Sequence, residues 1–476
     1  MKKKNNKLYK SANNEFSTNL LAVKKFRIVL ASLLIIFLLL LIRLIWLQFV
    51  QGSALKEKAY NQQTTDQIIS TSRGTIYDST GKTLAISTPT DTVTINPKKI
   101  VANTPEETKA KKEKVAKAFS DIFELNYDET LEKVNSTSNV QTIAKKVDKT
   151  KIDELKSWME EEKISTGINI DEDTKRVYPY NNLASNLIGF CGTDNTGIQG
   201  IEDSWNKVLQ GTPGKLTTST DAIREEIPDS NQTYIPAENG SDIVLTLDFN
   251  IQTILEKYLK QAVEENHADS GTVVALAPST GDVLGMACYP DYNLNTPFEP
   301  NTDELKSTWD KLDSATQSNE LYSMWKNDVI SSPYEPGSPY KLITAAVALE
   351  ENITSEDVAG DFYCDGVYVV ADRKISCWTQ GHKGTKTLRQ ALQVSCNPSL
   401  MQLGQRIGAP TLYKYYEAFG FFNKTNIDLP QEASSTYWEL EDVNDVELAT
   451  MSFGQRFTIT PIQLVSAISA IANDGV

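Results

Sequence analysis

The chain has 476 residues, of which 40% are hydrophobic and 23% are charged, so it is long enough for two or three domains with full hydrophobic cores. Its net charge of −15 argues against nucleic acid as the partner. Residues 1–27 hold eight basic side chains and one acidic one, a net of +7, which leaves −22 for the remainder. The basic tail and the acidic body are therefore expected to lie in different environments.

An apolar run follows the basic tail, from Ile28 to Leu47, and only Ser32 and Arg43 interrupt it. At about 1.5 Å per residue in a helix, such a run spans a hydrocarbon core of roughly 30 Å. The basic residues before the run indicate a cytoplasmic N-terminus, and no small-residue cleavage site follows it. We expect a cytoplasmic tail over 1–25 and a single-pass anchor in the cell membrane over 26–50, with the rest of the chain outside the cytoplasm.

The next region, residues 51–239, alternates strand and helix patterns. Thr104-Pro105 with Glu107 is typical of a helix start, and the helix that follows is expected to bury an apolar face. The other predicted elements are a helix over Ser53–Gln67, a hairpin of Thr75–Tyr77 with Leu84–Ile86, a helix over Lys151–Glu161 and a strand over Gly167–Ile170. This region shows no catalytic constellation.

A boundary is predicted between Gly211 and Gly240, where turn residues and polar residues gather. Beyond it the expected elements are a strand over Ile243–Leu247, a helix over Ile251–Ala262, and strands over Gly271–Ala277 and Val283–Ala287. Two adjacent antiparallel strands followed by mostly helical sequence indicate an α+β domain over residues 240–476.

The sequence contains five cysteines, at positions 191, 288, 364, 377 and 396. No pair has Cys-x-x-Cys spacing and only His267 and His382 accompany them, so we expect no zinc site and assign no metal or cofactor. Cys364 and Cys377 flank a predicted strand, Val367–Val370, and a disulfide between them across a hairpin is a hypothesis.

A serine and a lysine three residues apart stand at the expected start of a helix, in Tyr334-Glu335-Pro336-Gly337-Ser338-Pro339-Tyr340-Lys341. Pro339 suits the first helical position, which puts Ser338 at or beside the N-cap and Lys341 one turn later on the same face. A hydroxyl and an amine held together in this way can act as a nucleophile and its base. Ser-x-x-Lys also occurs at Ser53, Ser79, Ser204 and Ser323, so the pattern alone is weak.

A second polar pair, Ser395 and Asn397, follows an apolar helix pattern and precedes Pro398, which is expected to open the next helix. On an irregular segment between helices, the hydroxyl and the amide can both point into one cleft. The hydroxyl could pass protons and the amide could bind a peptide carbonyl.

Taken together, these features resemble the class B penicillin-binding proteins, the membrane-anchored transpeptidases of peptidoglycan synthesis. The resemblance covers nearly all of the chain after residue 20. Besides the two stretches above, it rests on Arg73-Gly74-Thr75-Ile76-Tyr77-Asp78, Arg176 with Tyr178-Pro179, Gly197–Glu202, Leu245–Asp248, Thr280–Leu284, Asn426–Glu432 and Ser452-Phe453-Gly454-Gln455.

The resemblance implies an elongated dimerisation-type pedestal domain over 51–239 and a transpeptidase domain, an antiparallel sheet flanked by helices, over 240–476. Ser338 would attack the D-Ala-D-Ala terminus of a stem peptide, Lys341 would take its proton and Ser395 would relay that proton. Asn397 and Glu335 would bind substrate. The implied partners are stem peptides, β-lactams, the membrane, a membrane glycosyltransferase and other cell-wall synthesis proteins.

The third motif of the family, Lys-Thr-Gly or Lys-Ser-Gly on a strand beside the serine, does not occur in the sequence. Lys383-Gly384-Thr385 has the wrong order and precedes Ser395. We expect the transpeptidase domain to be incomplete at its C-terminal end and the 476 residues to be a fragment of a longer reading frame. If residue 476 is the true end, we expect little or no transpeptidase activity and a poorly folded last domain.

Three other functions are compatible with parts of the pattern. The first is a non-catalytic scaffold that binds cell-wall synthesis proteins through residues 51–239. The second is a β-lactamase, which the long region between the apolar run and residue 240 argues against. The third is a penicillin sensor, which a single expected membrane span without an intracellular domain argues against. A role in division, elongation or sporulation cannot be read from the sequence.

Overall fold

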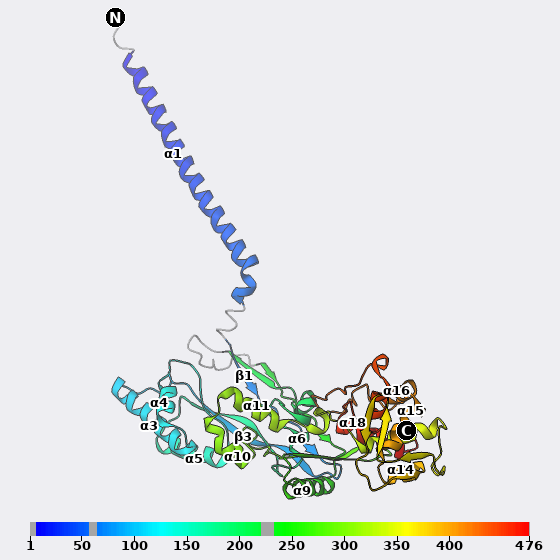
Figure 1. Cartoon of the computed structure of the whole chain (residues 1–476). Coiled ribbons are helices and arrows are strands. Elements are labelled where there is room, and N and C mark those ends of the chain that lie inside the picture. Colours follow the sequence, from blue (N-terminus) through cyan, green and yellow to red (C-terminus); the bar gives the residue numbers. More distant parts are fainter. Residues whose placement is uncertain (1–5, 57–63, 220–232, 476) are drawn as a thin grey trace. The chain divides into compact units, whose positions relative to one another are not determined.

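The computed structural model describes residues 6–56, 64–219 and 233–475, and the chain divides into two compact units (Figure 1). The first unit comprises Met1–Ile69 and Gly214–Pro236, and the second comprises Ser70–Pro213 and Ala237–Val476.

The first unit contains the apolar helix α1 (Asn6–Ile45), which continues through a π-helical turn, η1 (Trp46–Val50). Within it, Lys25–Val50 has a mean hydropathy of 3.1 and is long and apolar enough to cross a membrane. The unit also holds an antiparallel sheet of β1 (Thr64–Ile69), β6 (Gly214–Ser219) and β7 (Thr233–Ile235). The helix predicted over Ser53–Gln67 is therefore wrong from Thr64 onward, where β-branched residues pair with β6, and its middle part, 57–63, lies outside the described residues.

The first part of the second unit is built on a five-stranded sheet. Its strand order is β4-β3-β2-β8, with β5 also paired to β3, over β2 (Ile76–Tyr77), β3 (Thr83–Ile95), β4 (Gln141–Val147), β5 (Ile168–Val177) and β8 (Ile243–Val244). The predicted hairpin is confirmed, since Ile76 pairs with Ala85. The long strand β3 pairs with β5 from Ile86↔Val177 to Ile95↔Ile168.

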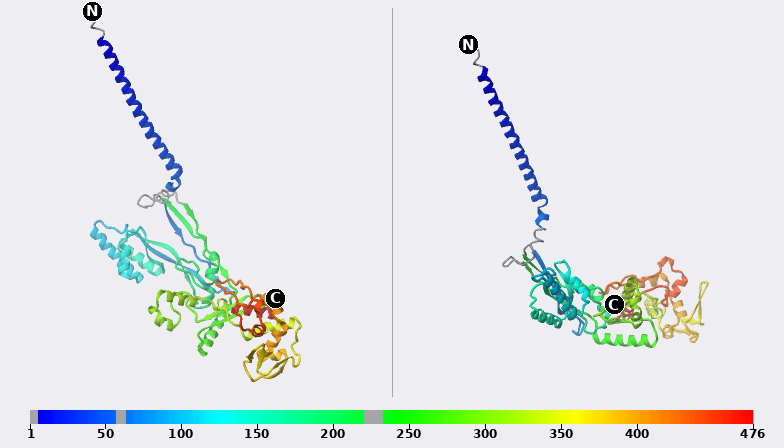
Figure 2. Two further views of the ribbon diagram at one scale, coloured as in Figure 1. Left: turned by 45° about the horizontal axis from the view of Figure 1, so that its top comes forward. Right: turned by 90° about the vertical axis from the view of Figure 1, so that its left-hand side faces the viewer.

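Three helices, α3 (Pro105–Phe123), α4 (Tyr127–Asn135) and α5 (Lys149–Glu161), gather at one end of this unit (Figures 1 and 2). The predicted start of α3 is confirmed, because the Thr104 side chain accepts a hydrogen bond from the Glu107 N–H and Pro105 stands in the first turn. The helix buries the apolar face that the sequence predicts, including Val115 and Phe119.

A buried ion-pair network joins three segments that are distant in sequence. Arg73 Nε lies 2.6 Å and Arg176 Nε 2.7 Å from the two carboxylate oxygens of Glu202, whose side chain is fully buried. The Tyr178 hydroxyl donates to the same carboxylate at 3.2 Å. Three of the motifs on which the family resemblance rests thus meet at one carboxylate, next to the short helices α6 (Ser185–Ile188), α7 (Gly200–Ser204) and α8 (Asn206–Leu209).

Asp78 connects this sheet to the next element of the chain. Its carboxylate accepts the backbone N–H groups of Thr80, Lys82 and Phe249, the last being the first residue of α9 (Phe249–Glu265). Burial raises the pKa of Asp78, but these N–H donors and the Thr80 hydroxyl outweigh it and hold the pKa below its usual value.

The remainder of the second unit contains, within the described residues, three antiparallel strand pairs and many helices. The predicted pair is confirmed as β9 (Gly271–Leu276) and β10 (Val283–Tyr289). Next come α10 (Asp303–Thr308), η2 (Trp309–Lys311), α11 (Ser314–Trp325), α12 (Asp328–Ser331), η3 (Ser338–Tyr340) and α13 (Lys341–Glu350). Short strands follow, β11 (Phe362–Cys364), β12 (Val367–Val370), β13 (Arg373–Ser376) and β14 (Gly384–Lys386). Of these, β11 pairs with β14 and β12 pairs with β13. The last helices are α14 (Leu388–Gln393), α15 (Asn397–Ile407), α16 (Ala409–Ala418), η4 (Leu440–Asp442), α17 (Asp445–Met451) and α18 (Pro461–Ala472).

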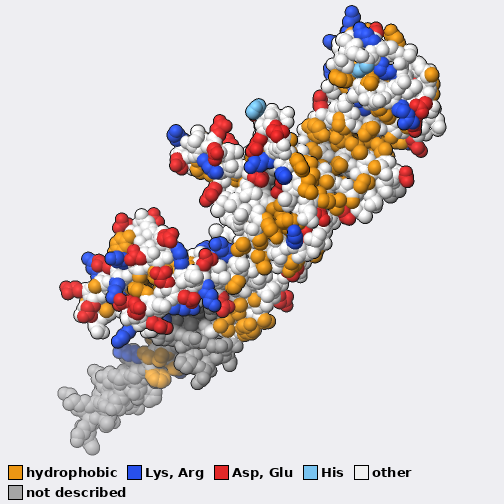
Figure 3. Space-filling model, turned by 90° about the horizontal axis from the view of Figure 1, so that it is seen from below, with side chains coloured by type: hydrophobic (Ala, Val, Ile, Leu, Met, Phe, Trp, Pro, Cys, Tyr) orange, Lys and Arg blue, Asp and Glu red, His pale blue; other side chains and the backbone are white. Residues whose placement is uncertain are grey.

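The core of this last part is largely aromatic and aliphatic and lies around α13 and α15. Tyr340, the residue before Lys341, is fully buried and its ring lies 4.7 Å from that of Phe457 and 5.6 Å from that of Tyr416. On the face of the unit seen in Figure 3, hydrophobic side chains form a band along the body, and charged side chains concentrate on the lobes beside it.

Candidate active site

Ser338 lies at the start of a helical segment, as the sequence predicts. It is the first residue of η3, which leads directly into α13, and Gly337 with φ of 61° is the N-cap residue. Ser338 is thus inside the first turn instead of capping it, with Pro339 next to it in that turn. Its hydroxyl oxygen faces Lys341 and Ser395, with which it forms hydrogen bonds.

Lys341 is the centre of the site. The residue is only 2% exposed, and its Nζ lies 3.1 Å from Ser338 Oγ, 2.8 Å from Ser395 Oγ, 2.9 Å from the Ser395 carbonyl oxygen and 2.6 Å from Asn397 Oδ1. The structure therefore brings together four of the five predicted site residues around one amine.

Burial lowers the pKa of Lys341 to about 8, although the nearby thiols of Cys377 and Cys396 act in the opposite direction. The neutral amine fits its neighbours. Two of them, the Ser395 carbonyl and the Asn397 amide oxygen, can only accept, and they use the two N–H bonds of a neutral amine. The nitrogen lone pair then remains for a hydroxyl proton of Ser338 or Ser395, which is the arrangement of a general base.

Ser395 and Asn397 come from the junction between α14 and α15. Ser395 Oγ donates to Ser338 Oγ at 2.9 Å, and Asn397 is the first residue of α15, with Pro398 following as predicted. Ser395 has φ of 50°, in the left-handed region that non-glycine residues rarely adopt. Such a conformation persists where the surrounding structure fixes it, and it is common at functional sites.

Glu335, the fifth predicted site residue, does not join this group in the structure. Its side chain is exposed, and its carboxylate accepts the backbone N–H of Arg456 at 2.9 Å. This contact holds the loop before Ser338 against the segment after α17.

The segment Ser452–Gly454 supports the nucleophile loop in a way that the sequence analysis did not predict. The Gly337 N–H donates to the Gly454 carbonyl at 2.8 Å, and a Cβ at Gly454 would lie 2.2 Å from the Gly337 oxygen. The Thr344 hydroxyl of α13 donates to the Ser452 carbonyl at 2.8 Å inside the core. Both glycines have positive φ, which favours glycine, and the close approach leaves no room for a side chain at Gly454.

Four potential metal ligands also meet beside this site. The Sγ atoms of Cys364, Cys377 and Cys396 and a ring nitrogen of His382 all lie within 4.8 Å of one another. The expectation of no zinc site rested on local spacing, whereas these residues come together only through the tertiary fold. The hypothesised disulfide is not formed, since both Cys364 and Cys377 are free thiols, and burial raises the pKa of Cys364 to about 11.

A cavity of about 790 Å³ lies elsewhere in the second unit. Its walls include Gly281 in the β9–β10 turn, Glu350 at the far end of α13 from Lys341, Phe419 after α16 and Ala470 in α18. The candidate active site is therefore defined by its polar contacts and not by this cavity.

Comparison with known proteins agrees with the fold and the site. Residues 271–476 match the family model described as the penicillin binding protein transpeptidase domain, and residues 68–245 match that of the penicillin-binding protein dimerisation domain. The two matches together cover more than half of the chain.

Two curated relatives illustrate the similarity. Stage V sporulation protein D of Bacillus subtilis (strain 168) is 32% identical over 461 residues, which are 96% of this chain and 66% of that protein. Peptidoglycan D,D-transpeptidase FtsI of Escherichia coli (strain K12) is 27% identical over 454 residues, 95% of this chain and 71% of that one. The chain thus spans about two thirds of the length of these relatives.

Solved structures share the fold. Penicillin Binding Protein 2X from Streptococcus thermophilus superposes with a TM-score of 0.64 at 22% identity, over 86% of this chain and 60% of that one. PBP2 from Helicobacter pylori, solved in complex with MreC, gives 0.68 at 22% identity, over 87% of this chain and 77% of that one.

The fold and the paired domains define a penicillin-binding protein with a transpeptidase domain. The chain belongs to class B of that family, in which an N-terminal apolar helix precedes a dimerisation domain and a transpeptidase domain.

Proposed function

We propose that this chain is a serine acyl-transfer D,D-transpeptidase that cross-links peptidoglycan stem peptides. One observation carries the proposal: a buried amine, Lys341, lies within hydrogen-bond distance of two hydroxyls, on Ser338 and Ser395. An amine with a pKa of about 8 is a usable general base near neutral pH.

In the first half-reaction, Ser338 Oγ bonds to the carbonyl carbon of the penultimate D-Ala and its proton passes to Lys341. The bond to the terminal D-Ala then breaks, and Ser395 relays the proton from Lys341 to the departing amine nitrogen. In the second half-reaction, the amine of a neighbouring stem peptide attacks the ester carbonyl and loses a proton along the same route. This restores the Ser338 hydroxyl and leaves a new amide, the cross-link.

Asn397 is assigned to hold the substrate amide. Its Oδ1 accepts from Lys341 at 2.6 Å, which leaves its NH₂ group to donate to a peptide carbonyl. β-Lactams, as mimics of the D-Ala-D-Ala terminus, acylate Ser338 in place of substrate. Substrate binding by Glu335 stays a prediction. One oxygen of its exposed carboxylate accepts the Arg456 N–H, which also supports the loop before Ser338.

The cellular setting forms part of the same proposal. The basic residues that precede the apolar run Ile28–Leu47 support an N-terminus in the cytoplasm, with the second unit on the outer side of the cell membrane. There it would meet stem peptides and work with a membrane glycosyltransferase and other cell-wall synthesis proteins. The domain bounds 51–239 and 240–476 stay predictions.

The rate of acylation is the finer question. The sequence contains no Lys-Thr-Gly or Lys-Ser-Gly, the motif that would supply a second oxyanion donor, and loss of one such donor costs roughly 10²–10³ in rate. Slow acylation by this 476-residue chain therefore stays a prediction. A chain that is not acylated at all would act as a scaffold for other cell-wall proteins.

Labelling with a fluorescent penicillin tests the proposal on the full chain in detergent. We expect a stable covalent label that Ser338→Ala abolishes. Ser323→Ala is the matched control, because Ser323 and Lys326 have the same Ser-x-x-Lys spacing, and this exposed serine lies near the end of α11. Its label should equal that of the unchanged protein.

Two results would contradict the proposal that this chain is a Ser338-dependent transpeptidase. Equal labelling of Ser338→Ala and the unchanged chain would place the acylated group elsewhere, and no labelling in either would favour the scaffold. Rapid release of hydrolysed penicillin in place of a stable label would instead identify a β-lactamase.

A further inference from the structure

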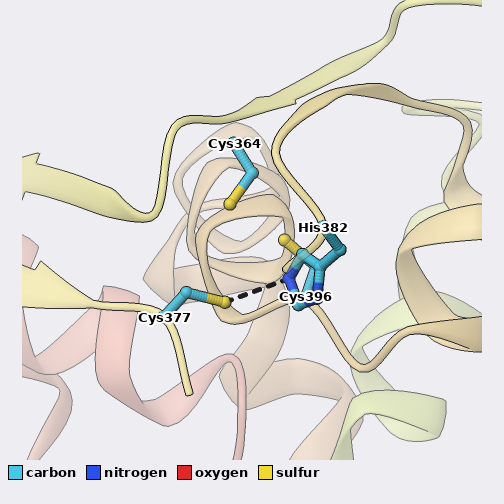
Figure 4. A group of neighbouring side chains, drawn as sticks. All are labelled: Cys364, Cys377, His382 and Cys396. Atoms are coloured by element: carbon cyan, nitrogen blue, oxygen red, sulfur yellow. Dashed lines mark hydrogen bonds between the residues drawn. The ribbon is translucent and has the colours of Figure 1, made fainter. Parts of the chain in front are cut away.

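Four side chains from separate segments converge on one point, as Figure 4 shows, and one of them, Cys396, stands between Ser395 and Asn397 in the sequence. Cys364 ends β11, Cys377 follows β13, His382 precedes β14 and Cys396 is the N-cap residue of α15. Cys377 Sγ lies 3.2 Å from His382 Nε2, and all four potential ligand atoms lie within 4.8 Å of one another.

Three thiols and one imidazole are a donor set that structural zinc sites use. A zinc tetrahedron with Zn–S of about 2.3 Å and Zn–N of about 2.0 Å has edges of roughly 3.5–3.8 Å between its ligands. All separations here lie within 4.8 Å, so each would need to shorten by at most about 1.3 Å, which side-chain rotation can supply.

Ordinary core packing explains the cluster less well than a metal does. The chain has five cysteines in 476 residues, and three of them meet at this point together with one of the two histidines. Most residues of the β12–β13 hairpin, which Cys377 follows, are exposed or half-buried, whereas the three cysteines are buried in the core around α13 and α15. A metal bound at the cysteines would tie this hairpin to that core.

Local geometry keeps the lobe close to the catalytic turn. Cys377 donates its backbone N–H to the Gly366 carbonyl at 2.9 Å, and Trp378 Nε1 donates to the Val394 carbonyl at 3.2 Å. Cys396 itself stands between Ser395 and Asn397, and its backbone N–H donates to Ala391 at 2.8 Å. A bond to the Cys396 sulfur would therefore fix the turn that carries both polar groups.

We propose that Cys364, Cys377, His382 and Cys396 bind one zinc ion, and that this ion holds the Ser395–Asn397 turn in its active conformation. Binding releases the three thiol protons and leaves three thiolates and a neutral imidazole on the metal. The four ligands are positioning residues, since they act on the chemistry only through Ser395 and Asn397. The metal site does not depend on the proposed function, whereas the positioning role does.

The first test is the metal content of the full chain, purified in detergent with reductant and without chelator. Plasma mass spectrometry should find one zinc per chain. Cys364→Ser and His382→Ala should each lower this content sharply, while Cys288→Ser and His267→Ala should leave it unchanged. Replacement by cobalt should give the visible and charge-transfer bands of a tetrahedral thiolate site.

The metal site would be overturned by several results. One is a chain that holds no zinc after dialysis against zinc with reductant, and another is a chain that holds iron or copper in place of zinc. A third is a Cys364→Ser variant that holds as much zinc as the unchanged chain. The last is a disulfide among the three cysteines, seen as the loss of two hydrogens in the intact mass of the freshly purified reduced chain.

The second test measures penicillin labelling of Ser338 with and without zinc. Removal of the ion should slow labelling, and adding zinc back should restore the rate in the unchanged chain but not in Cys364→Ser. Cys364→His, which keeps a zinc ligand, should recover most of both zinc and labelling. Unchanged labelling in the zinc-free chain would contradict the proposed positioning role of the ion but not the metal site. A chain that holds zinc but is never labelled would contradict the proposed function but not the metal site.

Discussion

A single amine carries much of the chemistry assigned to the site, and its environment could only partly be predicted. The pairing of Ser338 with Lys341 follows from helix geometry, because residues three apart share a face. The arrival of Ser395 and Asn397, more than fifty residues later, was predicted from a family resemblance and not from spacing. Burial of Lys341, which sets its basicity, depends on contacts that no local pattern indicates.

The pH dependence of acylation follows from Lys341. Because the pKa lies near 8 and the base must be neutral, the labelling rate of Ser338 should rise about tenfold per pH unit below 8 and level off above it. Stopped-flow or quenched labelling across this range measures it, with zinc held constant.

Lys341→Arg is the control for this profile, since its guanidinium stays charged at every pH tested and should label slowly throughout. A rate for the unchanged chain that stays flat from about pH 6 to 9 would show that Lys341 is not the base.

The cysteines and His382 form a group that residue-scale patterns do not reveal. Zinc motifs are recognised when ligands are close in sequence, and here the four proposed ligands lie in or beside three short strands and at a helix start. The cysteine between Ser395 and Asn397 is the one local signal of the group.

At the scale of elements, the sequence predicted several helices and strands of the second unit, among them α3, α5, α9 and the β9–β10 pair, but not how they support each other. The starts of α3 and α15 follow from capping residues and from proline in the first turn. By contrast, β1 reads as a helix with polar faces because nothing in its own residues reveals β6, about 150 residues later, as its partner.

The contact between Gly454 and Gly337 makes a prediction at this scale. Gly454→Ala would place a Cβ 2.2 Å from the Gly337 oxygen and force φ of +88° on a residue with a side chain. The loop that carries Ser338 must then shift, and a displacement of about 1 Å can cost roughly 10² in rate. Penicillin labelling should slow by that order.

Gly420→Ala is the matched control, because Gly420 has φ of +79° and nothing within 4 Å of an added Cβ. It should cost about 1–2 kcal/mol of stability from backbone strain alone and leave the labelling rate unchanged. Equal labelling by both variants would mean that the contact does not position Ser338.

At the scale of the whole molecule, the buried carboxylate of Glu202 connects parts of the second unit. Glu202→Ala would leave Arg73 and Arg176 as buried charges without their partner and should lower the free energy of unfolding by roughly 3–5 kcal/mol. Denaturant unfolding of the full chain, followed by tryptophan fluorescence, measures the change.

Glu113→Ala provides the comparison, since Glu113 pairs with Lys109 on an exposed helix face at 3.9 Å. That change should cost about 0.3–0.5 kcal/mol. If the two substitutions had similar effects, the network around Glu202 would not contribute to stability as its burial suggests.

The bond between Asp78 and α9 bears on how the molecule can be dissected. Strand β8, which follows the turn-rich boundary in the sequence, completes its sheet only by pairing with β2, and the Phe249 N–H reaches a carboxylate on the other side of that boundary. Cutting the chain near residue 240 and separating the two parts would expose the edge of β8. It would also remove the hydrogen bond that the buried Asp78 accepts from Phe249. A catalytic fragment prepared on its own would therefore need residues 70–80 supplied in trans before its behaviour could represent the intact protein.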